Sequence, residues 1–327
     1  MDDNFAEHGA FEAGEEPVAP DAAPHMENML MSIAGFTYAT IVGFDAEIAR
    51  LREMGVIDQA DSAYLAFVEQ MKAQHGLYDE PLGRTVLFES AALEDADRLM
   101  LATANEIGRP TVVMRVVETA PGVQALCIMA NAGLTSDNFK DMGTLVLQGI
   151  DQWGNPMDEA AAPYAEMTSS AQGAMRAIAL IRSAVANPRV SVLASASCMP
   201  DPESLVMRIL GPAERFEVPA PDAAERDAIW DHLMDKHVSL SSLDRYELVE
   251  LSQGMPRCDI FCAAREAVAQ AFHQSLSERR YIPVSRANVL DKVAAYQPLG
   301  SREYQRIEDC VVEDLRAEIE RYERGEL

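Results

Sequence analysis

Short runs of Val, Leu and Ile alternate with helical patterns through the middle of the chain, and this alternation is the strongest constraint on the fold. We expect strands at the apolar runs 85–88, 111–117, 144–147 and 190–194. Helical patterns cover residues 94–107 and 170–186. A further apolar run at 124–129 predicts an extra strand or one arm of a hairpin. Strands that alternate with helices predict a five-stranded parallel α/β domain with helices on both faces of the sheet.

The chain around this domain is expected to be helical or acidic. Five apolar stripes at helical spacing predict helices at 223–236, 242–251, 258–273, 285–294 and 303–322. The first 28 residues contain no Lys or Arg, so their composition predicts a disordered acidic tail. We therefore divide the chain into an acidic tail (1–28), N-terminal helices (29–83), the α/β domain (84–218), a helical domain (219–300) and a C-terminal helix (301–327).

The charge balance limits the partners of this protein. The chain has 53 acidic and 27 basic residues, a net charge of −26. Such a surface repels phosphate backbones and anionic lipids, so it disfavours nucleic-acid and membrane partners and favours basic protein surfaces or a high-salt interior. The uncharged stretch 28–44 is marginal for a membrane span, and we expect a buried or partner-facing helix there. Five cysteines, an odd number in apolar runs, and the lack of a basic leader indicate a reduced, cytoplasmic location.

Several segments resemble, in order and at the expected spacing, the motifs of one family. Residues 86–108 (VLFESAALEDADRLMLATANEIG) resemble the strand, P-loop and helix of the AAA family of AAA+ ATPases. Residues 144–153 (TLVLQGIDQW) are similar to the Walker B strand, and 192–200 (VLASASCMP) to the sensor 1 strand. Residues 217–222 (EVPAPD) resemble the entry to the family's helical lid, and 251–271 resemble its lid helix. The resemblance covers residues 84–300 and implies a three-layer αβα domain followed by a lid.

The positions that carry nucleotide chemistry in the family are replaced here. A P-loop binds phosphates through glycine-rich backbone, a Lys and a hydroxyl that holds Mg²⁺. The resemblance puts Ser90, Leu93 and Asp95 at glycine positions, Ala96 at the Lys position and Asp97 at the hydroxyl position. It puts Gln148 and Gly149 at the two Walker B acids and Ser197 at the sensor 1 Asn. None of the four lysines follows a glycine, so the chain has no Gly-Lys pair that could form a P-loop elsewhere.

The remaining family position is an arginine. Arg208 lies where the family has the first arginine that reaches a neighbouring subunit's nucleotide, and an ordinary surface arginine is the alternative reading. Gly211 occupies the second arginine position, for which Arg215 is a nearby substitute.

These replacements predict a catalytically inactive AAA+-like protein, a pseudo-ATPase, that is a structural or regulatory subunit of a larger assembly. We expect no cofactor, and protein partners in a homo- or hetero-oligomer that includes active AAA+ subunits by analogy with family rings. The first alternative is a divergent AAA+ ATPase that still binds ATP and Mg²⁺ to remodel a protein. The second is a clamp-loader-like subunit without an ATPase site of its own.

Two other groupings of cysteine and histidine residues have an ordinary structural role as the alternative to a functional one. Cys258 and Cys262, four apart on a predicted helix, could form a zinc site with His232 and His237, although the spacing matches no standard motif. Cys198 follows a central strand, where a nucleophile would need a His base. We expect no metal site and no catalytic residue among these.

Overall fold

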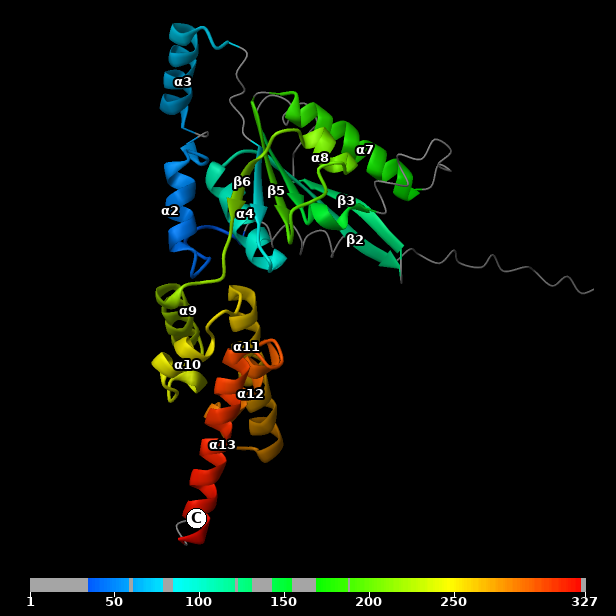
Figure 1. Cartoon of the computed structure of the whole chain (residues 1–327). Helices are drawn as coiled ribbons and strands as arrows, with labels where there is room; N and C mark the ends of the chain where they lie inside the picture. The colour runs from blue at the N-terminus through cyan, green and yellow to red at the C-terminus, as the bar shows by residue number, and fades with distance from the viewer. Residues whose placement is uncertain are drawn as a thin grey trace, which may run out of the picture.

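The computed structural model describes residues 35–58, 61–78, 85–120, 123–130, 143–154, 169–187 and 189–324. The chain forms an α/β domain, with two N-terminal helices beside it and a cluster of helices after it (Figure 1). The predicted acidic tail, residues 1–28, lies outside the described residues. No helix within the described ranges is long and apolar enough to cross a membrane.

The sheet has six described strands, one more than expected. The strands are β1 (Thr85–Glu89), β2 (Thr111–Ala120), β3 (Val123–Ala130), β4 (Gly143–Gln148), β5 (Val190–Ala196) and β6 (Glu214–Glu217). Their order is β3-β2-β4-β5-β1-β6. β3 runs antiparallel to β2, so the 124–129 run forms one arm of a hairpin, and the other pairs are parallel. The sequence did not predict β6, since Phe216 is its one buried residue.

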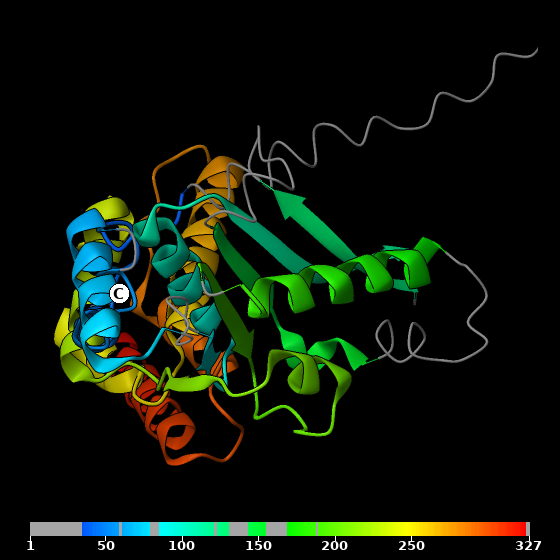
Figure 2. The same cartoon turned by 90° about the horizontal axis from the view of Figure 1, so that it is seen from above.

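Helices cover both faces of the sheet, as the alternation of strands and helices predicted. α4 (Leu93–Ile107) packs on one face, and α7 (Ser169–Val185) and α8 (Leu205–Leu210) pack on the other. Successive strand residues point to opposite faces. Val86 and Phe88 therefore join the core under α4, while Leu87 joins the core under α7. Figure 2 shows α7 lying along its face of the sheet.

The expected helix over residues 29–44 is wrong for residues 35–44, and its first residues lie outside the described part. Residues 35–44 form turns, and the helix begins at α2 (Asp45–Glu53). The Thr40 hydroxyl donates to the Gly35 carbonyl at 2.8 Å, which favours a turn over a helix. Phe44 is buried in the same core as β1 and α4, so the apolar stretch serves the α/β domain. α3 (Ser62–His75) follows, as predicted.

The C-terminal part of the chain is all helical. Its helices are α9 (Ala223–Lys236), α10 (Arg245–Leu251), α11 (Arg257–Glu278), α12 (Arg286–Ala295) and α13 (Arg302–Glu323). They share one core that includes Trp230, Ile260 and Val289. Ile307 of α13 joins this core, while the C-terminal part of α13 extends away from it (Figure 1). This helical domain is called the lid below.

Candidate functional site: the carboxyl edge of the sheet and the lid joint

The expected site segments meet at one edge of the sheet. β1 lies between β5 and β6, and β5 lies beside β4. Because these strands are parallel, their carboxyl ends lie at the same edge. The loop after β1, the Gln148–Gly149 turn after β4 and Ser197 after β5 are thereby brought together.

The loop after β1 is short and closely bonded to its neighbour strand. The Ser90 amide donates to the Ala196 carbonyl at 3.1 Å, and the Ser90 hydroxyl accepts from the Ala92 amide at 3.3 Å. α4 starts directly at Leu93. Ala96, at the position of the family's lysine, is fully buried in the core under α4. A lysine at that position would have its charge inside an apolar core, which is costly.

Asp97, where the resemblance expects a Mg²⁺-binding hydroxyl, is bonded to β5 instead. The Ser195 hydroxyl donates to an Asp97 carboxylate oxygen and accepts from the Gly149 amide at 2.9 Å. Burial raises the pKa of Asp97 to about 6, against the opposing effect of its bond from Ser195. Ser195 is fully buried and links the P-loop-like helix to the Walker B-like turn. No sequence pattern predicted this role for Ser195.

Gly149 needs its glycine for two reasons. Its φ is 60°, in the left-handed region that favours glycine. A Cβ atom added there would lie 3.2 Å from Leu93 Cδ2, a tight contact. The catalytic glutamate of the family's Walker B motif would therefore be strained at this position.

Ser197 is held by a neighbouring aspartate. Its amide donates to Asp151 Oδ2 at 3.2 Å, and its hydroxyl donates to the same oxygen. The exposed Cys198 has its Sγ 4.0 Å from that oxygen. A carboxylate already accepting two bonds is a poor base for a thiol, so this geometry does not form the Cys-His pair of a nucleophilic site.

Asp95 joins the α/β domain to the lid. Although it stands at a glycine position of the resemblance, its side chain is 1% exposed. Its carboxylate accepts from the Arg257 amide at 2.8 Å and from the Cys258 amide at 2.9 Å. These amides begin α11, and their bonds to a carboxylate satisfy donors that an uncapped helix leaves free. The carboxylate therefore caps the lid helix.

The Arg257 side chain continues this joint and is fully buried. Its guanidinium donates to the Gly43 carbonyl, to the Pro219 carbonyl at 2.6 Å and to Glu225 at 2.8 Å. It lies 3.1 Å from a Glu47 oxygen. It also stacks over the ring of Phe44, with 4.3 Å between the guanidinium carbon and the ring centroid.

One side chain therefore connects α2, the strand-to-lid linker and the lid. The carboxylates of Glu47 and Glu225 both lie on Arg257 and repel each other. Burial and the negative charge of Glu47 together raise the pKa of Glu225 to about 7. No sequence pattern singled out Arg257 or Glu47.

A cavity of about 630 Å³ lies between the loop after β1 and the lid. Its lining includes Glu89, Asp95 and Glu217. The one basic residue in its lining, Arg215, already pairs with Glu89. The cavity next to the loop after β1 therefore has an excess of negative charge.

The other candidates lie apart from this edge. Arg208 is exposed in the last turn of α8 and does not line this cavity. Cys262, His232 and His237 line a different cavity, whereas Cys258 is buried. Within the part of the chain that the structure describes, no three His, Cys, Asp or Glu side chains are grouped to hold a metal ion.

Comparison with known proteins adds no family: no family model matches the chain, and no curated protein is significantly similar to it in sequence.

Proposed function

We propose that this protein is a catalytically inactive AAA+-like protein, a pseudo-ATPase, that is a structural or regulatory subunit of a larger assembly. The observation that carries the proposal is the use of Asp95. In the resemblance this position is a glycine that leaves room for phosphate, whereas here a carboxylate fills it and accepts two backbone N–H bonds from the lid. The Asp95 carboxylate, which disfavours phosphate binding, thus caps the first turn of α11.

The sheet order supports the resemblance behind the proposal. The strands similar to Walker A, Walker B and sensor 1 are β1, β4 and β5, and the three are neighbours in the order β4-β5-β1. The motif-bearing loops therefore share one edge, as a common site requires. The Gly149 amide donates to the Ser195 hydroxyl, which donates to the Asp97 carboxylate, so hydrogen bonds link the turn after β4, β5 and α4.

Electrostatics supports the loss of ATP binding. A triphosphate in the cavity beside the loop after β1 would meet Glu89, Asp95 and Glu217, with Arg215 as the one basic residue in the lining. Like charges about 4 Å apart cost about 1 kcal/mol per pair in water, and more in a partly dry site. The missing Lys removes charge-assisted bonds worth about 1.5–3 kcal/mol. Both effects disfavour the phosphates.

An exposed helix face supports the role in an assembly. Val312, Leu315, Ile319 and Tyr322 of α13 recur at helical spacing and are 44–74% exposed. An apolar stripe of this kind is typical of a surface that packs against another helix. The net charge of −26 favours a partner whose flanking residues are basic.

Phosphate release from MgATP tests the proposal. The full chain, assayed over a wide concentration range so that any ring can assemble, should release no more phosphate than a protein-free blank. The Arg208→Ala variant should behave identically. Turnover that rises with protein concentration and is lost in Arg208→Ala would overturn the proposal in favour of a divergent ATPase.

A further inference from the structure

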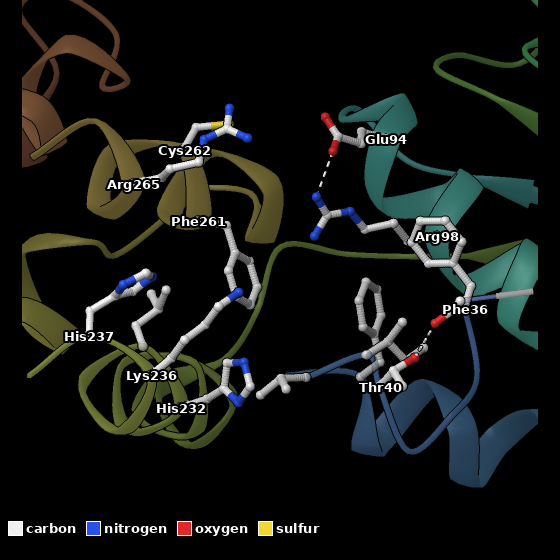
Figure 3. Close-up of a pocket in the computed structure, with 15 residues that line it drawn as sticks. Phe36, Thr40, Glu94, Arg98, His232, Lys236, His237, Phe261, Cys262 and Arg265 are labelled. Carbon is white, nitrogen blue, oxygen red and sulfur yellow. Dashed lines mark hydrogen bonds and ion pairs between the residues drawn. The ribbon is translucent and has the colours of Figure 1, made fainter. Parts of the chain in front are cut away.

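A second cavity lies between α4, α9 and α11, and it shares no lining residue with the cavity beside the loop after β1. It has a volume of about 440 Å³, within the range of small-molecule sites. Four segments line it: residues 35–44, the start of α4, the end of α9 and the second and third turns of α11 (Figure 3). Arg98 and Arg265 lie in helices of the resemblance but outside the loop from Ser90 to Asp97, and Lys236 lies outside the motifs; Glu94 alone among its charged residues belongs to that loop.

The cavity gathers positive charge on a strongly acidic protein. Its basic lining residues are Arg98, His232, Lys236, His237 and Arg265. Glu94 is the one acidic residue in the lining. The three arginine and lysine charges exceed the single carboxylate, whereas the chain as a whole carries −26. A local excess of this sign attracts an anion and concentrates it at the cavity.

The basic groups remain available to a ligand. Among the described residues, neither Lys236 nor Arg265 forms an ion pair, and both side chains are exposed. Arg98 pairs with Glu94 at 2.6 Å, an exposed contact that is worth little in water. Figure 3 shows Lys236 and Arg98 extending toward the space between α9 and α4.

An aromatic ring holds two of the basic groups in place. The guanidinium of Arg98 lies 5.5 Å from the Phe261 ring centroid, and the His232 ring meets Phe261 edge-on at 6.3 Å. The cation–π contact fixes the arginine without neutralising it. The positive wall of the cavity is therefore partly organised before any ligand arrives.

We propose that this cavity binds a small polyanion of the phosphate class, such as an inorganic polyphosphate or the phosphate groups of a phosphorylated metabolite. Arg98, Lys236 and Arg265 supply charge-assisted hydrogen bonds from α4, α9 and α11. His237 adds charge when protonated. The inference goes beyond the proposed function and stands without it, since none of these residues is part of the degenerate loop.

The site should bind more tightly as pH falls. The groups that face the two histidines are Glu94 and Arg98 on α4, Lys236 on α9, and Cys262 and Arg265 on α11, while residues 35–44 bring no titratable side chain to the lining. Burial, Lys236 and His232 lower the pKa of His237 in the free protein. A bound anion favours the protonated ring, so affinity should rise as pH falls below about 6.5.

Calorimetric titration of the full chain with sodium tripolyphosphate tests the inference. The buffer should be low in salt and contain EDTA in place of Mg²⁺, so that the P-loop mode of binding is excluded. We expect saturable binding with one site per chain. The Lys236→Glu/Arg265→Glu double variant should weaken binding at least tenfold, and Arg302→Glu, an exposed reversal at the start of α13, should leave it within twofold.

Fold integrity has its own control. Lys236 and Arg265 are exposed, so the double variant should melt within about 2 °C of the wild type. If the double variant unfolds, the single Lys236→Gln variant takes its place, and we expect that variant to weaken binding severalfold. The inference is overturned if tripolyphosphate fails to bind at millimolar concentration, or binds all variants equally. These outcomes leave the hydrolysis result of the proposed function unchanged, so the two proposals fail separately.

Discussion

Gly149 stands where the resemblance expects the Walker B glutamate, and its backbone geometry disfavours any side chain there. Its φ of 60° and the 3.2 Å approach of Leu93 Cδ2 both act against a side chain. Gly149→Ala should therefore lower the free energy of unfolding by about 1–2 kcal/mol, measured by urea denaturation. The control is Gly154→Ala, where a Cβ would meet open space. Equal stabilities for the two variants would show that position 149 accepts a side chain without strain.

Asp97 gives the edge of the sheet a distinct pH dependence. Its folded pKa of about 6 is above its ordinary value of 3.8, so the folded state holds this proton more tightly than the unfolded state. The contribution to stability is present below pH 4 and is lost as pH rises to 6. The stability of the wild type relative to Asp97→Asn should thus fall by about 2 kcal/mol between pH 4 and pH 7. The stabilities of the wild type and Asp97→Asn are measured by urea denaturation at each pH. If they differ by the same amount at every pH, the raised pKa of Asp97 is wrong.

Single residues were the hardest part of the site to predict. The resemblance identified Asp95 and Asp97 as positions where phosphate chemistry is lost, but no local pattern indicated what those carboxylates do instead. Arg257 was missed because its carbonyl partners, Pro219 and Gly43, lie 38 and 214 residues away in the chain. Contacts at such separations arise from tertiary packing, which periodicity does not report.

At the scale of elements, the start of α11 depends on a residue of α4. Asp95→Ala removes the carboxylate that caps α11 and leaves two buried amides without partners. We expect the variant to lose about 2–3 kcal/mol of stability, which lowers the melting temperature by roughly 5–10 °C. The matched control is Glu94→Ala, one residue earlier and 56% exposed at its side chain, with an expected change under about 0.5 kcal/mol.

The contrast between these two variants separates a joint from a surface charge. If Asp95→Ala and Glu94→Ala melt at the same temperature, Asp95 does not hold the lid, and the structural reading of the loop fails.

Elements that bury a continuous apolar face were predicted well, and those without one were not. The Val- and Leu-rich runs gave β1, β2, β4 and β5 to within a few residues, because both faces of each strand are covered. β6 was missed, since its ERFE sequence buries Phe216 alone. Residues 35–44 were predicted as helix because they are apolar, whereas their glycines and threonines form turns that pack Phe44 into the main core.

In the whole molecule, one joint holds four segments of the chain together. Asp95 and Arg257 connect α4, the segment before α2, the linker after β6 and the lid through buried bonds. Side chains from the same region form an acidic cavity where the resemblance expects phosphates. Positive charge is gathered instead in the separate cavity lined by Arg98, Lys236 and Arg265.

Nucleotide binding by the loop from Ser90 to Asp97 is tested by a thermal-unfolding titration of the full chain with ATP, with and without Mg²⁺. A ligand at about 100 times its dissociation constant adds roughly 2.7 kcal/mol of stability. For a chain of this size that corresponds to a rise of about 5–10 °C. We expect no Mg²⁺-dependent rise up to millimolar ATP, and any Mg²⁺-independent rise should disappear in Lys236→Glu/Arg265→Glu. A saturable, Mg²⁺-dependent rise that persists in that variant would contradict the proposed loss of ATP binding, because the loop from Ser90 to Asp97 would then bind nucleotide.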